Sequence, residues 1–535
     1  IIFLYITIVM KLYDKYVDDL IHLYPSFNDY LNLDKYKHLK HKLENTLDEC
    51  HIKKQKEFYT KYLKLISKKK RKNVYDKTLL YMCDEALESY KYNYDLIPIN
   101  HQENFLGYIL EWASGESVFS FTKKDDYINF IEKIQVFSDI VISIIDNMKM
   151  GIKKRYTMPK IICIKLIEQL EELLSTKTYI NNSIKIKLDF DFNDTCESIF
   201  VPPLKKLITF LKEEYINYCR TTIGMCGLPN GIKEYKFLVK TATTMSNITV
   251  DSIYNYGVQE VNRIYDLMHQ IKDKMEFKGS LKEFNNYLNR RKDMNFKSKE
   301  ELLNTYKKQL SSINRSIMRT QFYDNIKSKC EIIPVPKYNE KFSAEAYYMP
   351  GDLDMKRNGK FYINLRDIKE NNHMEVESLT LHEANPGHHY QLTYVNENPN
   401  IPLFIKIATN DAYQEGWALY CENLGKYKTY ESYYGKLILE MIRALRLVVD
   451  TGIHYYGWSY DKTFKYYRKY CFDSDYQIHN QLLRYISIPT QALSYKIGER
   501  VILDLKQKFK GRAKDFHRKI LEHGSLPLDI LVSLF

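Results

Sequence analysis

The chain has 535 residues, more than one ordinary hydrophobic core organises, so several packed lobes are expected. Hydrophobic residues make up 44% and charged residues 27% of the sequence, which excludes a disordered chain. The net charge is +13, but the 80 basic and 67 acidic residues are interleaved without a nucleic-acid-binding motif, so we expect neither a nucleic acid nor a membrane as partner.

The apolar residues 1–10 are too few to span a bilayer, which takes about 20 residues, and they lack the basic segment of a signal peptide. We interpret them as upstream or trimmed residues before a start at Met10. A removed signal or anchor is the alternative. The nine cysteines are scattered without a C-x-x-C motif, which favours reduced thiols and a cytoplasmic location.

An N-terminal helical lobe is predicted over residues 11–225, because apolar residues recur there at spacings of three and four. The expected helices are 11–24, 35–67, 76–93, 126–150, 158–178 and 203–220. Breakers such as Pro202-Pro203 are expected to separate them. The basic run at 68–72 is interpreted as a solvated helix end, with a nucleic-acid or membrane contact as the alternative.

A helical connecting region is predicted over residues 226–330. The glycine-rich segment 224–231 is expected to be a loop. Helices are expected at 251–272 and 299–328, and Thr249 or Asp251 is the expected cap of the first.

The last region, residues 331–535, is the predicted catalytic region. Short β-branched and aromatic segments predict two or three strands of a small sheet, at 331–338, 344–351 and 359–365. A helix is expected to start near Asn372 or His373, and others are expected at 408–424, 432–450, 459–470, 477–483, 490–510 and 513–522. The predicted fold is mainly α, with the small sheet next to the helix that starts near residue 372.

Residues 382–389 read HEANPGHH and begin like H-E-x-x-H, in which two histidines one helical turn apart bind zinc and the glutamate is the general base. Pro386 occupies the place of the second histidine. On a straight helix His388 faces away and His389 lies about 10 Å along the axis, too far for one ion. Pro386-Gly387 therefore predicts a bulge or kink, and a bulge that absorbs two extra residues would return His388 to the metal. Whether His388 or His389 reaches the metal stays open from the spacing alone. The alternative is a helix that Pro-Gly ends, followed by surface histidines.

A third zinc ligand is predicted in the segment 410–424, because a catalytic zinc takes three protein ligands. Glu415 lies 27 residues after His388, and Asp411 and Glu422 share its helix face. We interpret Glu415 as the ligand and Asp411 or Glu422 as the support of a histidine. The alternative is that each acid is a surface carboxylate.

These two motifs resemble a known family. HEANPGHHYQ followed by EGWALYCE is similar to the bacterial metallohydrolases catalogued as domain of unknown function 885, zinc peptidase-like proteins of the gluzincin kind. Further similar stretches are LVKTATTMSNITVDSIYNYGVQEV (238–261), AYYMPGDLDMKRNGKFYINLRD (346–367), RLVVDTGIHYYGWS (446–459), RYISIPTQALSYKIGERVI (484–502) and FHRKILEHGSLPLDIL (516–531). The resemblance runs from about residue 11 to the C-terminus.

The resemblance implies a helical fold of two lobes split by a deep cleft, similar to angiotensin-converting enzyme and the oligopeptidases. It implies one Zn²⁺ per chain, bound by His382, His388 and Glu415. Glu383 matches the general base. His389 falls on the less constrained position of the histidine pair, where supporting a ligand or lining the cleft is its expected role.

Other residues are candidates for further roles in peptide hydrolysis. The reaction builds an oxyanion, which a Tyr or His donor stabilises, and the candidate donors are His454, Tyr485 and Tyr495. The candidates for holding a substrate carboxylate are Arg443, Arg484 and Lys496. For each of them a packed structural role is the alternative.

The predicted function is the hydrolysis of short peptides by a zinc-dependent metallopeptidase of a dipeptidase-like or carboxypeptidase-like kind. In the predicted reaction the metal activates a water whose proton Glu383 accepts. One alternative is a zinc-dependent amidase or esterase that acts on a non-peptide substrate. Another is a catalytically silent binding protein, against which the intact Glu383 argues. The oligomeric state stays open, with a homodimer as one possibility.

Overall fold

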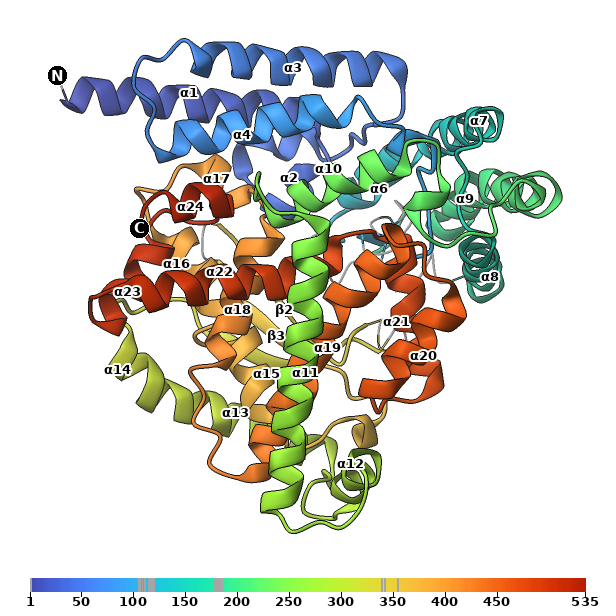
Figure 1. Cartoon of the computed structure of the whole chain (residues 1–535). Coiled ribbons are helices and arrows are strands. Elements are labelled where there is room, and N and C mark those ends of the chain that lie inside the picture. Colours follow the sequence, from blue (N-terminus) through green and yellow to red (C-terminus); the bar gives the residue numbers. More distant parts are fainter. Residues whose placement is uncertain are drawn as a thin grey trace. The chain divides into compact units, whose positions relative to one another are not determined.

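The structure of the chain is a computed structural model (Figure 1). It describes all residues except 1, 104–106, 108, 110–111, 114–120, 178–183, 185, 338–339, 341–342 and 354–355. The side chains of residues 1–10 and the ends of the predicted segments 158–178 and 331–338 lie outside the described part. The chain divides into two compact units, the first formed by 1–235, 453–459 and 486–489 and the second by 236–452, 460–485 and 490–535.

The first unit is built from helices, blue to green in Figure 1. They are α1 (Ile2–Leu23), α2 (Phe27–Leu31), α3 (Glu49–Ser67), α4 (Val74–Ser89), α6 (Lys124–Ile134), α7 (Phe137–Lys154), α8 (Lys160–Thr176) and α9 (Phe192–Thr209). Most of the helices predicted for the N-terminal lobe are therefore present. None of the described helices of the chain combines the length with the apolar composition that spanning a bilayer demands.

Two predicted helices of this unit have wrong boundaries. The range 35–67 becomes a short 3₁₀ turn at Asp34–Leu39 and then α3, which starts only after Asp48. The Asp48 side chain accepts a hydrogen bond from the backbone N–H of His51 and so caps α3. The range 126–150 is interrupted between α6 and α7.

The prediction that Pro202-Pro203 separates two helices is wrong, because both prolines lie inside α9. Each proline removes one backbone donor from the helix. The residues around them, Phe200 and Leu204, are buried, and packing of this apolar face maintains the helix despite the lost hydrogen bonds.

The sequence analysis missed several helices, among them the following two. One is α10 (Gly231–Thr243), which begins where the predicted loop 224–231 ends. The other is α12 (Leu281–Arg290), in which the Ser280 and Glu283 side chains form a capping box. The spacing of Ser280 and Glu283 is a sequence signal for a helix start, so α12 was predictable.

The second unit contains the predicted sheet. Its strands are β1 (Cys330–Pro334), β2 (Ala346–Met349) and β3 (Gly359–Ile363), in the order β1-β3-β2. β1 pairs with β3 in parallel and β2 pairs with β3 antiparallel. The sheet, and with it the prediction of a mainly α fold that carries a small sheet, is confirmed.

Helices surround this sheet in the second unit. They are α11 (Val250–Lys274), α12, α13 (Lys299–Ile313), α14 (Arg319–Gln321), α15 (Val376–Glu383), α16 (His388–Glu397), α17 (Leu403–Ile407), α18 (Asp411–Glu422), α19 (Tyr430–His454), α20 (Tyr460–Tyr470), α21 (Asp475–Ser487), α22 (Ser494–Lys508), α23 (Ala513–Leu521) and α24 (Leu528–Val532). The Thr249 side chain caps α11, as predicted.

One apolar core fixes the motif helix α15 against the sheet. It joins buried side chains of α13, of β1 and β3, and of the α15 segment: Leu302, Tyr306, Ile332, Phe361, Ile363, Val376 and Ala384. Because the core holds both ends of α15, the side chains near its C-terminus have a fixed direction.

Helices α18 and α22 lie side by side in unusually close contact (Figure 1). A Cβ on Gly498 of α22 would collide with the carbonyl oxygen of Ala412, and one on Gly416 of α18 would collide with the backbone of Gly498. The two glycines therefore permit a backbone approach that brings the first turn of α22 beside α18.

Candidate metal centre

The motif HEANPGHH is divided between two helices. α15 ends at Glu383 and α16 begins at His388, so the predicted interruption is a break between helices rather than a bulge within one. The indole Nε1 of Trp417 on α18 donates a hydrogen bond of 2.8 Å to the carbonyl oxygen of Pro386. This contact ties the link between the two helices to α18.

Gly387 passes directly over the end of α15. A Cβ at this position would collide with the backbone carbonyl oxygens of His382 and Leu381. Only glycine therefore lets the chain turn back closely enough for α16 to begin beside the last turn of α15.

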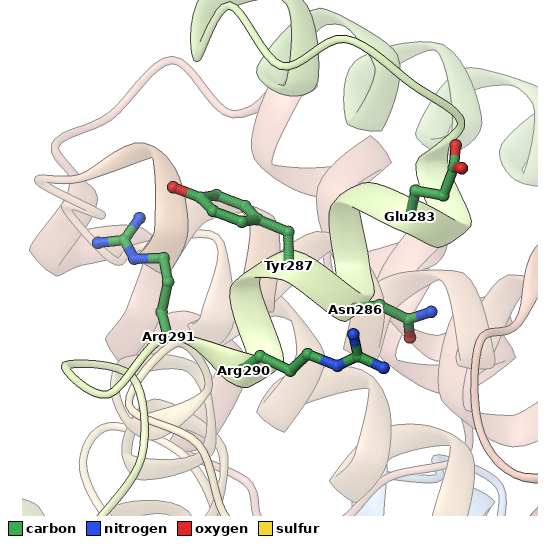
Figure 2. Close-up of a pocket in the computed structure, with 5 residues that line it drawn as sticks. All are labelled: Glu283, Asn286, Tyr287, Arg290 and Arg291. Atoms are coloured by element: carbon green, nitrogen blue, oxygen red, sulfur yellow. The ribbon is translucent and has the colours of Figure 1, made fainter.

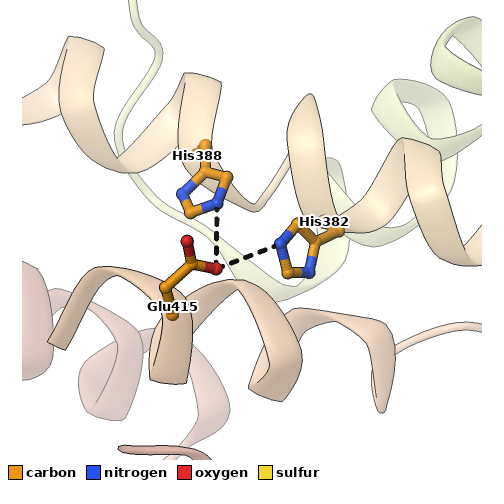
Figure 3. Close-up of side chains that lie close together, drawn as sticks. All are labelled: His382, His388 and Glu415. Carbon is orange, nitrogen blue, oxygen red and sulfur yellow. Dashed lines mark ion pairs between the residues drawn. The ribbon is translucent and has the colours of Figure 1, made fainter. Parts of the chain in front are cut away.

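The break brings His382, His388 and Glu415 together, as Figure 3 shows. Nε2 of His382 lies 3.4 Å and Nε2 of His388 lies 3.6 Å from Oε2 of Glu415. The three potential ligand atoms all lie within 4.8 Å of one another, and in the described part of the chain no other group of His, Cys, Asp and Glu side chains meets that condition. His388, and not His389, is the second histidine of this group.

The chemistry of this group fits a metal ion. Oε2 of Glu415 is buried and has no hydrogen-bond partner. Its contacts to the two imidazole nitrogens, at 3.4 and 3.6 Å, are longer than good hydrogen bonds, and a cation between the three atoms would replace these weak contacts. Two histidines and one glutamate are also a ligand set of catalytic zinc, which leaves a fourth position open.

The charges of the group favour a cation as well. Burial opposes ionisation of Glu415, but His382 and His388 hold the pKa of its carboxyl well below its usual range. Burial also opposes a charge on His382, but Glu415 and Glu422 raise the pKa of its imidazole to about 10. A proton and a metal ion therefore compete for His382.

Glu422 orients His382. Its Oε1 lies 2.8 Å from Nδ1 of His382, and its Oε2 accepts a hydrogen bond of 2.6 Å from Ser378. An ionised carboxylate only accepts, so Nδ1 carries a proton, and Nε2 is the nitrogen that faces Glu415 and for which a proton and a metal ion compete. Of the two predicted supports, Glu422 therefore contacts a histidine, whereas Asp411 is exposed and accepts from Gln491 at 3.5 Å.

Glu383, the predicted general base, is the last residue of α15. Its side chain is only 8% exposed, and this burial raises the pKa of its carboxyl, with His382 and His388 as nearby opposing charges. A carboxylate whose pKa is raised accepts a proton more readily near neutral pH.

His389 points to the sheet rather than to the metal group. Its Nδ1 lies 3.0 Å from the hydroxyl of Tyr348 on β2, and a Cβ on Gly359 of β3 would touch its ring. Burial lowers the pKa of His389 to about 4, so the imidazole is neutral. Its observed role is to attach α16 to the sheet.

Two of the predicted oxyanion donors lie in the second unit. Tyr495 is in the first turn of α22, and burial followed by the Glu415 carboxylate raises the pKa of its phenol. Tyr485 is buried, and its hydroxyl donates to Gln481 at 3.1 Å. Of these two, Tyr495 is the one placed within electrostatic range of the metal group.

The third predicted donor, His454, belongs to the first unit. It is fully buried, its Nδ1 accepts a hydrogen bond of 3.2 Å from the backbone of Met225, and its ring stacks on Tyr235 at a centroid distance of 5.5 Å. These are packing contacts within that unit, and they favour the structural alternative.

Lys496 does not have a free ammonium group. Its Nζ lies 3.0 Å from Glu260, 2.7 Å from Glu440 and 2.6 Å from Glu499, and the side chain is buried. Three carboxylates from α11, α19 and α22 already occupy the cation. Lys496 is therefore a structural residue, and the prediction that it binds a substrate carboxylate is not supported by its contacts.

The two predicted arginines have fewer partners. Arg443 donates a hydrogen bond of 3.2 Å to the carbonyl oxygen of Leu439 in its own helix, and it is an electrostatic neighbour of Glu383. Arg484 donates to Gln491 at 2.9 Å.

Sequence reasoning missed two residues of this region. Ser378 lies one turn before His382 on α15, and that spacing is a signal that could have found it. Arg446 lies three residues after Arg443 on α19, and its chemical context appears only in the structure.

A separate surface hollow lies along α12 (Figure 2). It is lined by Glu283, Asn286, Tyr287, Arg290 and Arg291. Arg291 there is already paired with Asp293 and with Glu431 at 2.7 Å. None of the predicted site residues lines this hollow.

The fold and the site define a mainly helical protein with a candidate two-histidine, one-glutamate metal centre. Over residues 25–534 the sequence matches the family described as "Bacterial protein of unknown function (DUF885)", and the chain belongs to this family. The domain of unknown function indicated by the motifs is thus confirmed. No curated protein is similar enough in sequence to match.

Two solved structures share the fold. One is a "putative lipoprotein" from Colwellia psychrerythraea, with a TM-score of 0.87, 21% identity and coverage of 99% of this chain and 98% of that chain. The other, from Shewanella oneidensis, is described as a lipoprotein of unknown function, with a TM-score of 0.77, 17% identity and coverage of 98% of each chain. At these identities the likeness shows the fold alone, and the cytoplasmic location of this chain stays a prediction.

Proposed function

We propose that this protein is a gluzincin-like, zinc-dependent metallohydrolase that cleaves short peptides, with Glu383 as the general base. The observation that supports it most is the buried Oε2 of Glu415, which has no hydrogen-bond partner and faces the Nε2 atoms of His382 and His388. A buried oxygen in that state calls for a cation.

Bound at this group, zinc would supply a Lewis acid for the scissile carbonyl and lower the pKa of a water to about 7. Glu383 takes the proton of that water and returns it to the leaving amine. We infer that Tyr495 is the donor for the oxyanion, since the Glu415 carboxylate, after burial, raises the pKa of its phenol. A peptide as the substrate rests on the family resemblance of the motifs.

The direct test combines metal analysis of freshly purified protein with a peptide-library assay. We expect about one zinc per chain, as at a single catalytic site, and cleavage of short peptides. Absence of metal together with no recovery on adding zinc would contradict the proposal. If the protein hydrolyses only non-peptide amides or esters, its activity is that of an amidase or esterase and not of a peptidase.

Glu422→Gln is expected to weaken zinc binding without abolishing it. The amide cannot hold the Nδ1 proton of His382 as an ionised carboxylate does, and loss of such a support typically costs about 10- to 100-fold in metal affinity. Competition with a chromophoric chelator measures the affinity. The exposed Glu300 provides the matched control, Glu300→Gln, and equal affinities of the two variants would show that Glu422 has no such role.

Gly387→Ala is expected to separate His388 from His382, because the added Cβ collides with the end of α15. The zinc content should fall, and the free energy of unfolding should fall by about 1–3 kcal/mol, as for an overpacked site. Gly107→Ala is the control, since a Cβ there meets nothing within 4 Å. Metal analysis and thermal unfolding provide the readouts, and an unchanged zinc content would refute the expected displacement.

A further inference from the structure

Three arginines near the candidate metal centre form no direct ion pair with the described residues. Arg443 and Arg446 are three residues apart on α19 and so share one face, and Arg484 comes from α21. In the described part of the chain none of the three has a carboxylate oxygen within 4.0 Å. Arg443 is an electrostatic neighbour of Glu383 and Glu422, and Arg484 of Asp411. Interior cations in folded proteins are normally paired, so the buried Arg446 is the member of the group that most lacks an anion.

Arg446 is the most buried of the three, with 6% of its surface exposed. Its Nε donates to the hydroxyl of Tyr485 at 3.3 Å, and its guanidinium carbon lies 4.4 Å from the centre of the Tyr495 ring. Its Nη1 is buried without a hydrogen-bond partner, and so is Nε of Arg443. The aromatic contact fixes the plane of the guanidinium and leaves donors unfilled.

Side chains of α18 and α22 link this group to the metal ligands. Gln491 accepts a hydrogen bond of 2.9 Å from Arg484 and contacts Asp411 at 3.5 Å, and Asp411 lies one helical turn before Glu415. Tyr495, which Arg446 stacks on, is in turn within electrostatic range of Glu415. The carboxylates of Asp411 and Glu415 are electrostatic neighbours of Arg484 and Tyr495, so a cation at the metal centre would favour an anion beside the arginines.

We propose that Arg446, assisted by Arg443 and Arg484, binds the free C-terminal carboxylate of a short peptide, so that the protein cleaves near the carboxyl end of its substrates. The proposal rests on the proposed hydrolase function. A carboxylate has two oxygens that each accept a charged hydrogen bond, and the unfilled Nη1 of Arg446 and Nε of Arg443 would provide one donor each. The same chemistry would accept an acidic side chain, and the test separates the two sources.

Binding is measured on zinc-loaded Glu383→Gln protein, so that no peptide is consumed. Three tetrapeptide libraries are passed over the immobilised protein: neutral peptides with a free carboxyl end, the same peptides amidated, and amidated peptides that carry one Asp or Glu. Mass spectrometry quantifies retention. We expect the free-carboxylate library to be retained about 10- to 100-fold more strongly than the amidated one, the range of a charged hydrogen bond.

Variants in the same background assign the effect to residues. Arg446→Gln should abolish the preference and Arg446→Lys should keep part of it, since an ammonium keeps the positive charge but not the planar guanidinium. Arg484→Gln, at a less buried position, should weaken the preference and covers the case in which Arg446→Gln fails to fold. Arg512→Gln is the control, because that side chain is 76% exposed and pairs with Asp515.

Equal retention of the free and amidated libraries, or retention of neither, overturns the proposal. Stronger retention of the acidic-side-chain library overturns the C-terminal assignment, and a preference that survives both Arg446→Gln and Arg484→Gln overturns the residues. The Glu383→Gln protein could prefer the free-carboxylate library while the wild type hydrolyses no peptide. That result would support the anion site and refute the hydrolase function. Equal hydrolysis of both libraries by the wild type refutes the anion site and leaves the hydrolase function standing.

Discussion

Replacing Glu383 by glutamine is expected to reduce peptide hydrolysis about 100- to 10,000-fold, the usual contribution of a general base. Glutamine keeps the size of the side chain but cannot accept a proton at neutral pH. Glu383 is not one of the three converging ligands, so the zinc content should equal that of the wild type. The readouts are kcat on the tetrapeptide library and metal analysis of the same preparations.

Glu300→Gln is the matched control for Glu383→Gln, since Glu300 is exposed at the start of α13 and far from the motif in sequence. The control should keep wild-type kcat and zinc. A near wild-type kcat of the Glu383→Gln protein would show that Glu383 is not the general base. Loss of zinc together with activity would mean that Glu383 acts on the metal site itself.

Glu415→Ala is expected to abolish stoichiometric zinc binding. It removes one of three ligands, so the loss of affinity should exceed the about 10- to 100-fold that removal of a supporting residue costs. Added zinc at 100 times the dissociation constant stabilises a folded protein by about 2.7 kcal/mol, which appears as a rise in Tm. The wild type should show this rise and Glu415→Ala should not.

The metal-free variant provides a second readout for Glu415. Because the substitution removes the carboxylate that pairs with the buried His382 and with His388, metal-free Glu415→Ala should unfold at a lower temperature than the metal-free wild type. Glu300→Ala serves as the control for the loss of a carboxylate. Normal zinc binding by Glu415→Ala would show that the third ligand is another residue.

The interruption at Pro386-Gly387 was predictable because its causes are local. Proline removes a helix donor and glycine permits a close turn, so two residues were enough to indicate that His388 could replace the missing fifth position of the motif. The small sheet was predictable for a similar reason, since short β-branched segments between turn residues define strands without reference to partners. The helix break, the strands and the convergence of His388 with His382 and Glu415 are all present.

What could not be predicted depends on contacts between distant segments. Sequence alone left Asp411 and Glu422 equivalent as supports, and only the packing of α15 on α18 places Glu422 against His382. In the sequence Lys496 cannot be told from any other cation, because two of the three carboxylates that surround it come from other helices. Pro202-Pro203 inside α9 shows the same limit, because tertiary packing outweighed the local preference.

Zinc K-edge X-ray absorption of the purified protein tests the central claim most directly, because it reports the ligand atoms themselves. We predict nitrogen and oxygen neighbours only, at about 2.0–2.2 Å, with the imidazole signal reduced in His388→Ala and unchanged in His389→Ala. A sulfur neighbour at about 2.3 Å, or a spectrum that His388→Ala leaves unchanged, would contradict a metal centre built from His382, His388 and Glu415.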